Sequence, residues 1–204
     1  MSTGTGRLAG KVAIITGASK GTGAVMGKQF ADAGARVLMV ARTEDTVKDA
    51  AAAAGNGAIG IRADVTNEAD VVAMVDRTLD EWGQVDILIN NAGIQHVAPV
   101  DEFPEDKWDA IMSIILSSAF HTTKAALPAM KAKGWGRVIN TGSMHSLVAS
   151  PYKVAYNAAK HGLAGLTKTV AREFARDNLP RHATVFMSLV AEGQARGTMR
   201  PLAP

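Results

Sequence analysis

Two residues with complementary chemistry stand one helical turn apart in the segment YNAAK at positions 156–160. Tyr156 and Lys160 project from the same side of any α-helix that spans them, because residues four apart are neighbours on a helix surface. An ammonium beside a phenol favours the phenolate and lowers the pKa of the hydroxyl from its usual value of about 10. Alone, this spacing is also typical of an ordinary helix face, so the other motifs have to decide between the two interpretations.

A glycine-rich segment indicates nucleotide binding. TGASKGTG, residues 16–23, follows the apolar, β-branched segment KVAIITG and opens a segment with the pattern of a helix. Gly17, Gly21 and Gly23 would let the backbone turn tightly and approach a pyrophosphate, which then lies at the positive end of that helix. A glycine triplet placed between a first strand and a first helix predicts a dinucleotide site.

The residue at the end of the second predicted strand bears on the choice of cofactor. An acidic residue there would accept hydrogen bonds from the ribose 2′-hydroxyl of NAD. The segment VARTED has Arg42 instead, and Lys20 lies in the glycine loop. Both cations could pair with a 2′-phosphate, so the sequence predicts NAD(P)(H) and favours NADP(H). A solvated surface arginine is the alternative.

Apolar segments alternate regularly with segments that have helical periodicity. Strands are predicted at 11–17, 34–42, 57–65, 84–93 and 136–143, and helices at about 22–33, 44–54, 67–82, 105–131 and 153–176. Strands that are apolar throughout, each separated from the next by a helix, indicate a parallel sheet covered on both faces. We therefore predict an α/β, Rossmann-like doubly wound fold in three layers (αβα), with ligands at the carboxyl ends of the strands.

Composition excludes several other classes. The 204 residues suit a single domain, 1–204, and the formal net charge of +3 comes from scattered basic residues, so we expect no nucleic-acid partner. Cysteine is absent, and no metal site is expected. The start of the chain lacks an apolar signal core and no apolar run approaches membrane-spanning length, so we expect a cytoplasmic protein with no membrane partner.

Taken together, these motifs resemble those of the short-chain dehydrogenase/reductase family over residues 8–176, with ADV at 63–65, NNAG at 90–93 and Ser143 at the family's order and spacing. The resemblance implies that Tyr156 is the general acid/base of a hydride transfer, that Lys160 acidifies it and holds the nicotinamide ribose, and that Ser143 hydrogen-bonds the substrate oxygen. It implies a cofactor site made of Thr16, Gly17, Ser19, Lys20, Gly21, Thr22, Gly23, Arg42, Asp64, Val65, Asn91, Ala92 and Gly93, together with Tyr156 and Lys160.

Within the family, three longer segments resemble the D-3-hydroxybutyrate dehydrogenases: NNAGIQHVAPV, LSSAFHTTKAALPAMKAKGWGRVIN and HSLVASPYKVAYNAAKHGLAGLTKTV. This resemblance implies that Gln95, His145 and Lys153 bind the carboxylate of a small substrate near Ser143 and Tyr156. The expected reaction interconverts 3-hydroxybutyrate and acetoacetate, or a similar short hydroxy acid and its ketone. That group mostly uses NAD, which conflicts with Arg42. An NADPH-dependent ketone or 3-oxoacyl reductase is the alternative.

Two departures from the family pattern leave a third interpretation open. Ile115 stands where the family has an asparagine that helps bind a water in the proton relay, and isoleucine offers no hydrogen bond. Residues 177–204 form an atypical C-terminal segment, so we expect six strands, with the usual seventh missing. A catalytically impaired nucleotide-binding remnant therefore stays a possible interpretation. The resemblance also implies a homo-oligomer, either a dimer or a tetramer.

Overall fold

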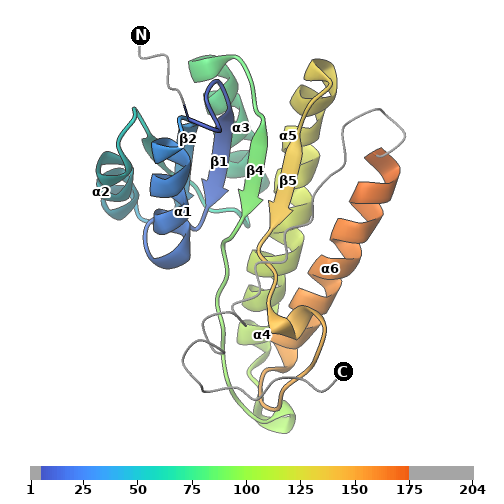
Figure 1. Ribbon diagram of the computed structural model, residues 1–204. Helices are drawn as coiled ribbons and strands as arrows, with labels where there is room; N and C mark the ends of the chain where they lie inside the picture. The colour runs from blue at the N-terminus through green and yellow to red at the C-terminus, as the bar shows by residue number, and fades with distance from the viewer. Residues whose placement is uncertain (1–5, 175–204) are drawn as a thin grey trace.

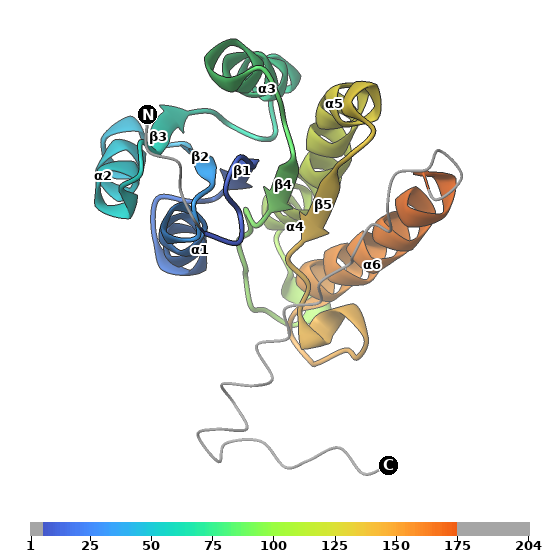
Figure 2. The same cartoon turned by 45° about the horizontal axis from the view of Figure 1, so that its top comes forward.

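A computed structural model describes residues 6–174 of the chain. Within them, a parallel sheet has the strand order β3-β2-β1-β4-β5 (Figures 1 and 2). The strands are β1 (Val12–Thr16), β2 (Arg36–Ala41), β3 (Ile59–Arg62), β4 (Ile87–Asn90) and β5 (Arg137–Asn140). The chain builds outward from β1 to β3 and then crosses to β4, which makes β1/β4 the switch point of a doubly wound sheet.

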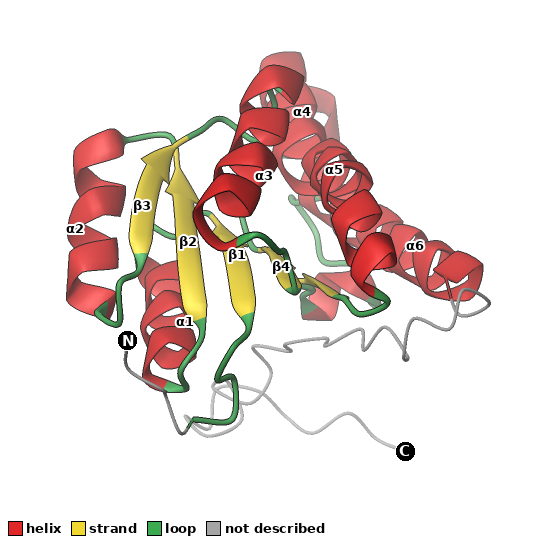
Figure 3. Ribbon diagram, turned by 90° about the horizontal axis from the view of Figure 1, so that it is seen from above, coloured by secondary structure: helices red, strands yellow, loops and turns green. Residues whose placement is uncertain are grey.

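Helices cover both faces of the sheet because successive strand residues point to opposite sides. Ala13 and Ile15 pack on the side of α1 (Gly21–Asp32) and α2 (Glu44–Ala54). Ile14, between them, packs on the side of α3 (Glu68–Trp82) and α5 (Ser118–Lys133). The layers are visible from above in Figure 3. This double burial explains why the strands are apolar throughout, and the predicted three-layer α/β architecture is confirmed.

The longest helical stretch is continuous but not uniform. It comprises α4 (Glu105–Met112), a π-helical segment at Ser113–Ser117, and α5. Its length and composition would suffice to cross a membrane, so the expectation that no segment reaches that length was wrong. In the fold it is a core helix: Ile111 and Ile115 pack against the last helix, whereas Ala126 and Met130 pack on the sheet.

The last described helix, α6 (Val154–Phe174), lies beside β5 and carries both residues of the YNAAK pair (Figure 2). Its buried side packs against Ile111 and Ile115 of the long helix through Ala155, Ala159 and Leu163. Small alanine side chains allow close approach of the two helices. The apolar packing fixes the rotation of α6 about its axis, and therefore the direction in which Tyr156 and Lys160 project.

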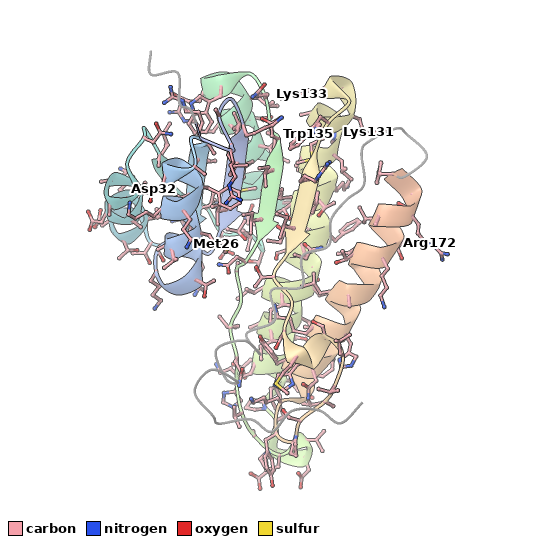
Figure 4. The ribbon with its side chains drawn as sticks, in the orientation of Figure 1. Met26, Asp32, Lys131, Lys133, Trp135 and Arg172 are labelled. Carbon is pink, nitrogen blue, oxygen red and sulfur yellow. The ribbon has the colours of Figure 1, made fainter. Side chains whose placement is uncertain are left out.

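The amino ends of the strands are closed by a charged and aromatic cluster. Asp86 is fully buried and accepts hydrogen bonds from the main-chain N–H of Val12 at 2.8 Å and from Lys133 Nζ at 2.5 Å. The Lys11 ammonium lies 3.7 Å from the ring centroid of Trp135. Figure 4 labels Lys133 and Trp135 at this end. These interactions hold the sheet together at the edge opposite the glycine loop.

All ten predicted strands and helices within the described residues are confirmed. The strands are shorter than predicted, because glycines and polar residues at their ends belong to loops that leave the sheet. The expected sixth strand, in RHATVFMSLV at 181–190, and the atypical segment 177–204 lie outside the described residues.

Candidate active site

The glycine loop joins the carboxyl end of β1 to the start of α1. Gly17 and Gly21 have φ values of +64° and +56°, a left-handed conformation that favours glycine. A β-carbon on Gly23 would stand 2.2 Å from the carbonyl oxygen of Gly17, so only glycine fits there. The N-cap residue of α1, Lys20, makes no side-chain capping bond. The main-chain N–H groups that open α1 are thus suited to an anion.

Asn91 holds this loop to the end of β4. Its side-chain amide donates to the carbonyl oxygens of Thr16 at 3.1 Å and Gly17 at 3.2 Å. In return, the hydroxyl oxygen of Thr16 accepts from the main-chain N–H groups of Asn91 at 3.0 Å and Ala92 at 3.1 Å. The two loops flanking the switch point are therefore one rigid unit, joined by the hydroxyl of Thr16 and the side-chain nitrogen of Asn91.

A cleft opens beside this unit at the carboxyl ends of β2, β3 and β4, lined among others by Arg42, Asp64, Val65, Ala92 and Gly93. All five belong to the cofactor site expected from the sequence. Ser19, Lys20 and Thr22, also expected there, lie in the glycine loop at the start of α1.

The charge on Asp64 is held in place by its neighbours. Burial alone would raise the pKa of this carboxyl group, but hydrogen bonds from the main chain and hydroxyl of Thr66, and the positive charges of Arg42 and Arg62, lower it overall. Both hydrogen bonds from Thr66 go to Asp64 Oδ1, at 3.0 Å from the main-chain N–H and 2.8 Å from the hydroxyl. The carboxylate is therefore ionised near neutral pH and can accept a hydrogen bond from a ligand amino group.

Lys160 and Tyr156 lie together on α6, facing the end of β5. Lys160 is 5% exposed, and its Nζ donates to the carbonyl oxygen of Thr141 at 2.5 Å. The Nζ lies 5.6 Å from the centroid of the Tyr156 ring. Burial lowers the pKa of Lys160 to about 8. At pH 7 the ammonium form still predominates, so a positive charge lies near the Tyr156 ring.

Ser143 lies in the loop after β5, at the start of a 3-10 turn, Met144–Ser146. Its Oγ accepts a hydrogen bond from the main-chain N–H of His145 at 3.2 Å, and its own N–H donates to Ser146 Oγ at 3.1 Å. The ring of His145 in turn meets the ring of Tyr156 edge-on, with centroids 5.8 Å apart. The structure thus brings the sequence-predicted residues Ser143, His145, Tyr156 and Lys160 to one place.

Gln95 and Lys153 come from two neighbouring loops. Gln95 is exposed in the loop after β4, and Lys153 is half-buried just before α6. A hydrogen bond of 3.0 Å from the Ala98 N–H to the Tyr152 carbonyl joins these loops. These two loops therefore form one rim beside the start of α6, the helix that carries Tyr156.

Ile115 is buried in the π-helical segment, with 3% of its surface exposed. Its side-chain carbons lie 3.7 and 3.9 Å from where a β-carbon on Gly93 would stand. Its side chain therefore packs against the loop after β4. It is apolar where the family has the hydrogen-bonding amide of an asparagine.

Sequence reasoning missed two contributions to this site. The carbonyl of Thr141 anchors the Lys160 ammonium, but a main-chain acceptor leaves no trace in a residue pattern. Asn91 was expected to line the cleft, and its role as a clamp on the glycine loop depends on a contact across 75 residues of sequence. The adjacent Asn90 and Asn91 were the available signal, because two amides at the end of a buried strand require hydrogen-bond partners.

Fold and site together define an oxidoreductase that uses a nicotinamide dinucleotide. The model of the short chain dehydrogenase family matches residues 11–193. The chain belongs to this family.

The chain is also similar to individual dehydrogenases and reductases. A D-beta-hydroxybutyrate dehydrogenase of Cupriavidus necator is 46% identical over 179 residues, which cover 86% of this chain and 69% of that protein. One from Rhizobium meliloti is 44% identical over 174 residues, which cover 83% of this chain and 67% of that protein. A 3-oxoacyl-[acyl-carrier-protein] reductase of Vibrio cholerae is 39% identical over 168 residues, which cover 82% of this chain and 69% of that protein. The crystal structure of a putative short-chain alcohol dehydrogenase from Sinorhizobium meliloti has a TM-score of 0.80 at 34% identity, covering 85% of this chain and 70% of that one.

Proposed function

We propose that the protein transfers a hydride between NADP(H) and the hydroxyl-bearing carbon of a short 3-hydroxy acid, such as 3-hydroxybutyrate, forming the corresponding ketone. The observation that carries this proposal is the buried Lys160 ammonium beside the Tyr156 ring. The names of two relatives, both D-beta-hydroxybutyrate dehydrogenases, suggest the substrate. When bound, the nicotinamide supplies the hydride acceptor.

In the proposed reaction, Tyr156 and Ser143 act on the substrate oxygen. Tyr156, as phenolate, takes the hydroxyl proton while the hydrogen on the same carbon leaves as a hydride, and the carbon–oxygen bond becomes a carbonyl. Ser143 accepts a hydrogen bond from the His145 N–H, so its own proton can be donated to the substrate oxygen. Lys160 would place its positive charge beside Tyr156 while that proton is transferred.

The proposed cofactor site extends from the glycine loop to the cleft at β2. The N–H groups that open α1 would bind the pyrophosphate. Asp64 and Val65 would contact the adenine, and Tyr156 and Lys160 the nicotinamide ribose. Arg42, exposed at the end of β2, would pair with the 2′-phosphate, and Lys20 in the glycine loop is a second cation that could do so; this is the reason to prefer NADP(H) over NAD(H).

The substrate carboxylate would be bound by Lys153 and Gln95 at the rim, together with His145. A cation and an amide donor at the rim suit a short acid that carries one negative charge. Single-domain organisation over 1–204, a cytoplasmic location and a homo-oligomer are further parts of the proposal, and light scattering would measure the oligomeric state.

The experiment follows NAD(P)H absorbance with 3-hydroxybutyrate, and in reverse with acetoacetate, for the wild type and Tyr156→Phe. We expect turnover in the wild type, a loss of about a thousandfold or more in the variant, and a lower KM for NADP than for NAD. Equal activity in the two proteins would rule out the assigned mechanism.

A second candidate function rests on Ile115, whose apolar side chain occupies the place of the relay asparagine. In that case the protein binds the nucleotide but turns over slowly or not at all, and calorimetry would detect cofactor binding without turnover on any alcohol. The relative named as a 3-oxoacyl reductase suggests a third: preference for a 3-oxoacyl thioester over 3-hydroxybutyrate in the same assay would favour it.

A further inference from the structure

Ser146 lies three residues after Ser143, in the loop that follows β5. It is buried, with 4% of the residue exposed, and its Oγ accepts a hydrogen bond from the main-chain N–H of Ser143 at 3.1 Å. The main-chain N–H of Ser146 donates in turn to the carbonyl oxygen of Ser143 at 2.9 Å. The two serines are therefore joined at both main-chain polar groups of Ser143.

The side chain of Ser143 is bonded within the same turn. Its Oγ accepts from the main-chain N–H of His145 at 3.2 Å. The arrangement is a capping box, in which two side chains each accept from a main-chain N–H at the start of the turn. Because a hydroxyl oxygen that accepts one hydrogen bond still carries its own proton, the proton of Ser143 is available to the substrate oxygen.

This turn contacts the helix that carries Tyr156. The ring of His145 lies edge-on to the ring of Tyr156, with centroids 5.8 Å apart. Further along the loop, the side-chain amide of Asn157 donates to the carbonyl oxygen of Ser150 at 2.8 Å and fastens the loop to α6. Since α6 is also held by apolar packing on the long helix, a change in the shape of the turn would move Ser143 relative to Tyr156.

We propose that Ser146 is a positioning residue, which holds Ser143 where its hydroxyl can donate to the substrate oxygen while Tyr156 transfers the proton. The proposal rests on the proposed function for its kinetic test. Ser143 and Tyr156 act on one substrate atom, and misplacing a reacting group by about 1 Å can cost about a hundredfold in rate. Loss of the Ser146 hydroxyl should therefore lower turnover through Ser143 and leave binding of the substrate carboxylate nearly unchanged.

The kinetic test is a double-mutant cycle that compares Ser146→Ala, Ser143→Ala and the double variant with the wild type. We expect Ser146→Ala to lower kcat about tenfold, with KM for the hydroxy acid within about twofold. Ser143→Ala should lower kcat about a hundredfold or more. The double variant should match Ser143→Ala within about twofold, because Ser146 acts only through the Ser143 hydroxyl. The control Ser117→Ala, at an exposed position of the long helix, should keep the wild-type kcat.

Three results would overturn the proposal. The first is an unchanged kcat in Ser146→Ala. The second is a loss of about tenfold from Ser146→Ala in the Ser143→Ala background as well, since the effect would then be a general loss of structure. The third is a KM raised about tenfold at unchanged kcat, which would assign the effect to the neighbouring His145 and to carboxylate binding.

A second measurement does not depend on activity. Amide hydrogen exchange of Ser143 can be followed by NMR on serine-labelled protein, and the signal is assigned by its absence in Ser143→Ala. We expect this amide to exchange about tenfold faster in Ser146→Ala and at the wild-type rate in Ser117→Ala. An unchanged rate in Ser146→Ala would refute the proposal whether or not the wild type turns over. Faster exchange in a protein whose wild type is inactive would support the hold on Ser143 and count against the proposed function alone.

Discussion

Replacing Lys160 with methionine should stabilise the protein at neutral pH while abolishing the proposed reaction. Lys160 is buried, and burial lowers its pKa from 10.5 to about 8. The folded state therefore bears the desolvation of an ammonium at pH 7. Methionine has a similar length and no charge, so it fills the same space without that cost.

The size of the effect follows from the two pKa values. A difference of about 2.5 pKa units corresponds to about 3 kcal/mol at pH 7. Loss of the hydrogen bond to the Thr141 carbonyl offsets about 1 kcal/mol of that. Lys160→Met should therefore raise the free energy of unfolding by about 2 kcal/mol at pH 7.

The pH dependence provides a sharper check than the value at one pH. Between pH 8 and pH 10.5, the unfolded chain retains a proton on Lys160 that the folded chain has lost. The free energy of unfolding of the wild type therefore rises with pH across that window because of Lys160. The variant has no ionisable group at this position, so its stability lacks this rise. The advantage of Lys160→Met should shrink from pH 8 upward and disappear by about pH 10.

Urea unfolding followed by circular dichroism at pH 7, 8, 9 and 10, without cofactor, measures this difference. Lys168→Met is the matched control, since Lys168 lies two turns further along α6 and is exposed; it should leave both the stability and its pH dependence nearly unchanged. A Lys160→Met variant less stable than the wild type at pH 7, or a stability difference that stays constant from pH 7 to pH 10, would refute the reasoning that burial depresses the pKa of this lysine.

Three further substitutions probe the site and its support. Ile115→Asn should raise kcat tenfold or more if the missing relay amide limits turnover; an unchanged kcat in a folded variant would exclude that role. Asn140→Ala should cost about 2–4 kcal/mol in urea unfolding, because Asn140 is 5% exposed and pairs with Asn90 at 2.8 Å and Thr167 at 2.9 Å; a loss below about 0.5 kcal/mol would contradict the network. Gly23→Ala should weaken cofactor binding at least tenfold by calorimetry, since its β-carbon would meet a carbonyl oxygen at 2.2 Å, whereas Gly165→Ala, with no atom within 4 Å, should bind normally.

The fold class could be predicted from the sequence because it depends on local, repeated signals. Strands buried on both faces must be apolar throughout, and Gly17 and Gly21 adopt a left-handed conformation that other residues disfavour. Tyr156 and Lys160 share a helix face by spacing alone. The π-helical segment at Ser113–Ser117 was not predicted, since the same apolar pattern also fits a regular α-helix.

The sequence alone thus determined a nucleotide-binding loop, a doubly wound sheet and a tyrosine–lysine pair, because period and spacing are properties of the chain itself. Only the tertiary structure decided what these groups touch. It placed the Lys160 ammonium on the Thr141 carbonyl, turned Asn91 back onto the glycine loop, and set the ring of His145 edge-on against that of Tyr156. Burial and partners across the fold set the charge and the direction of a side chain, and neither is encoded in the identity of the residue.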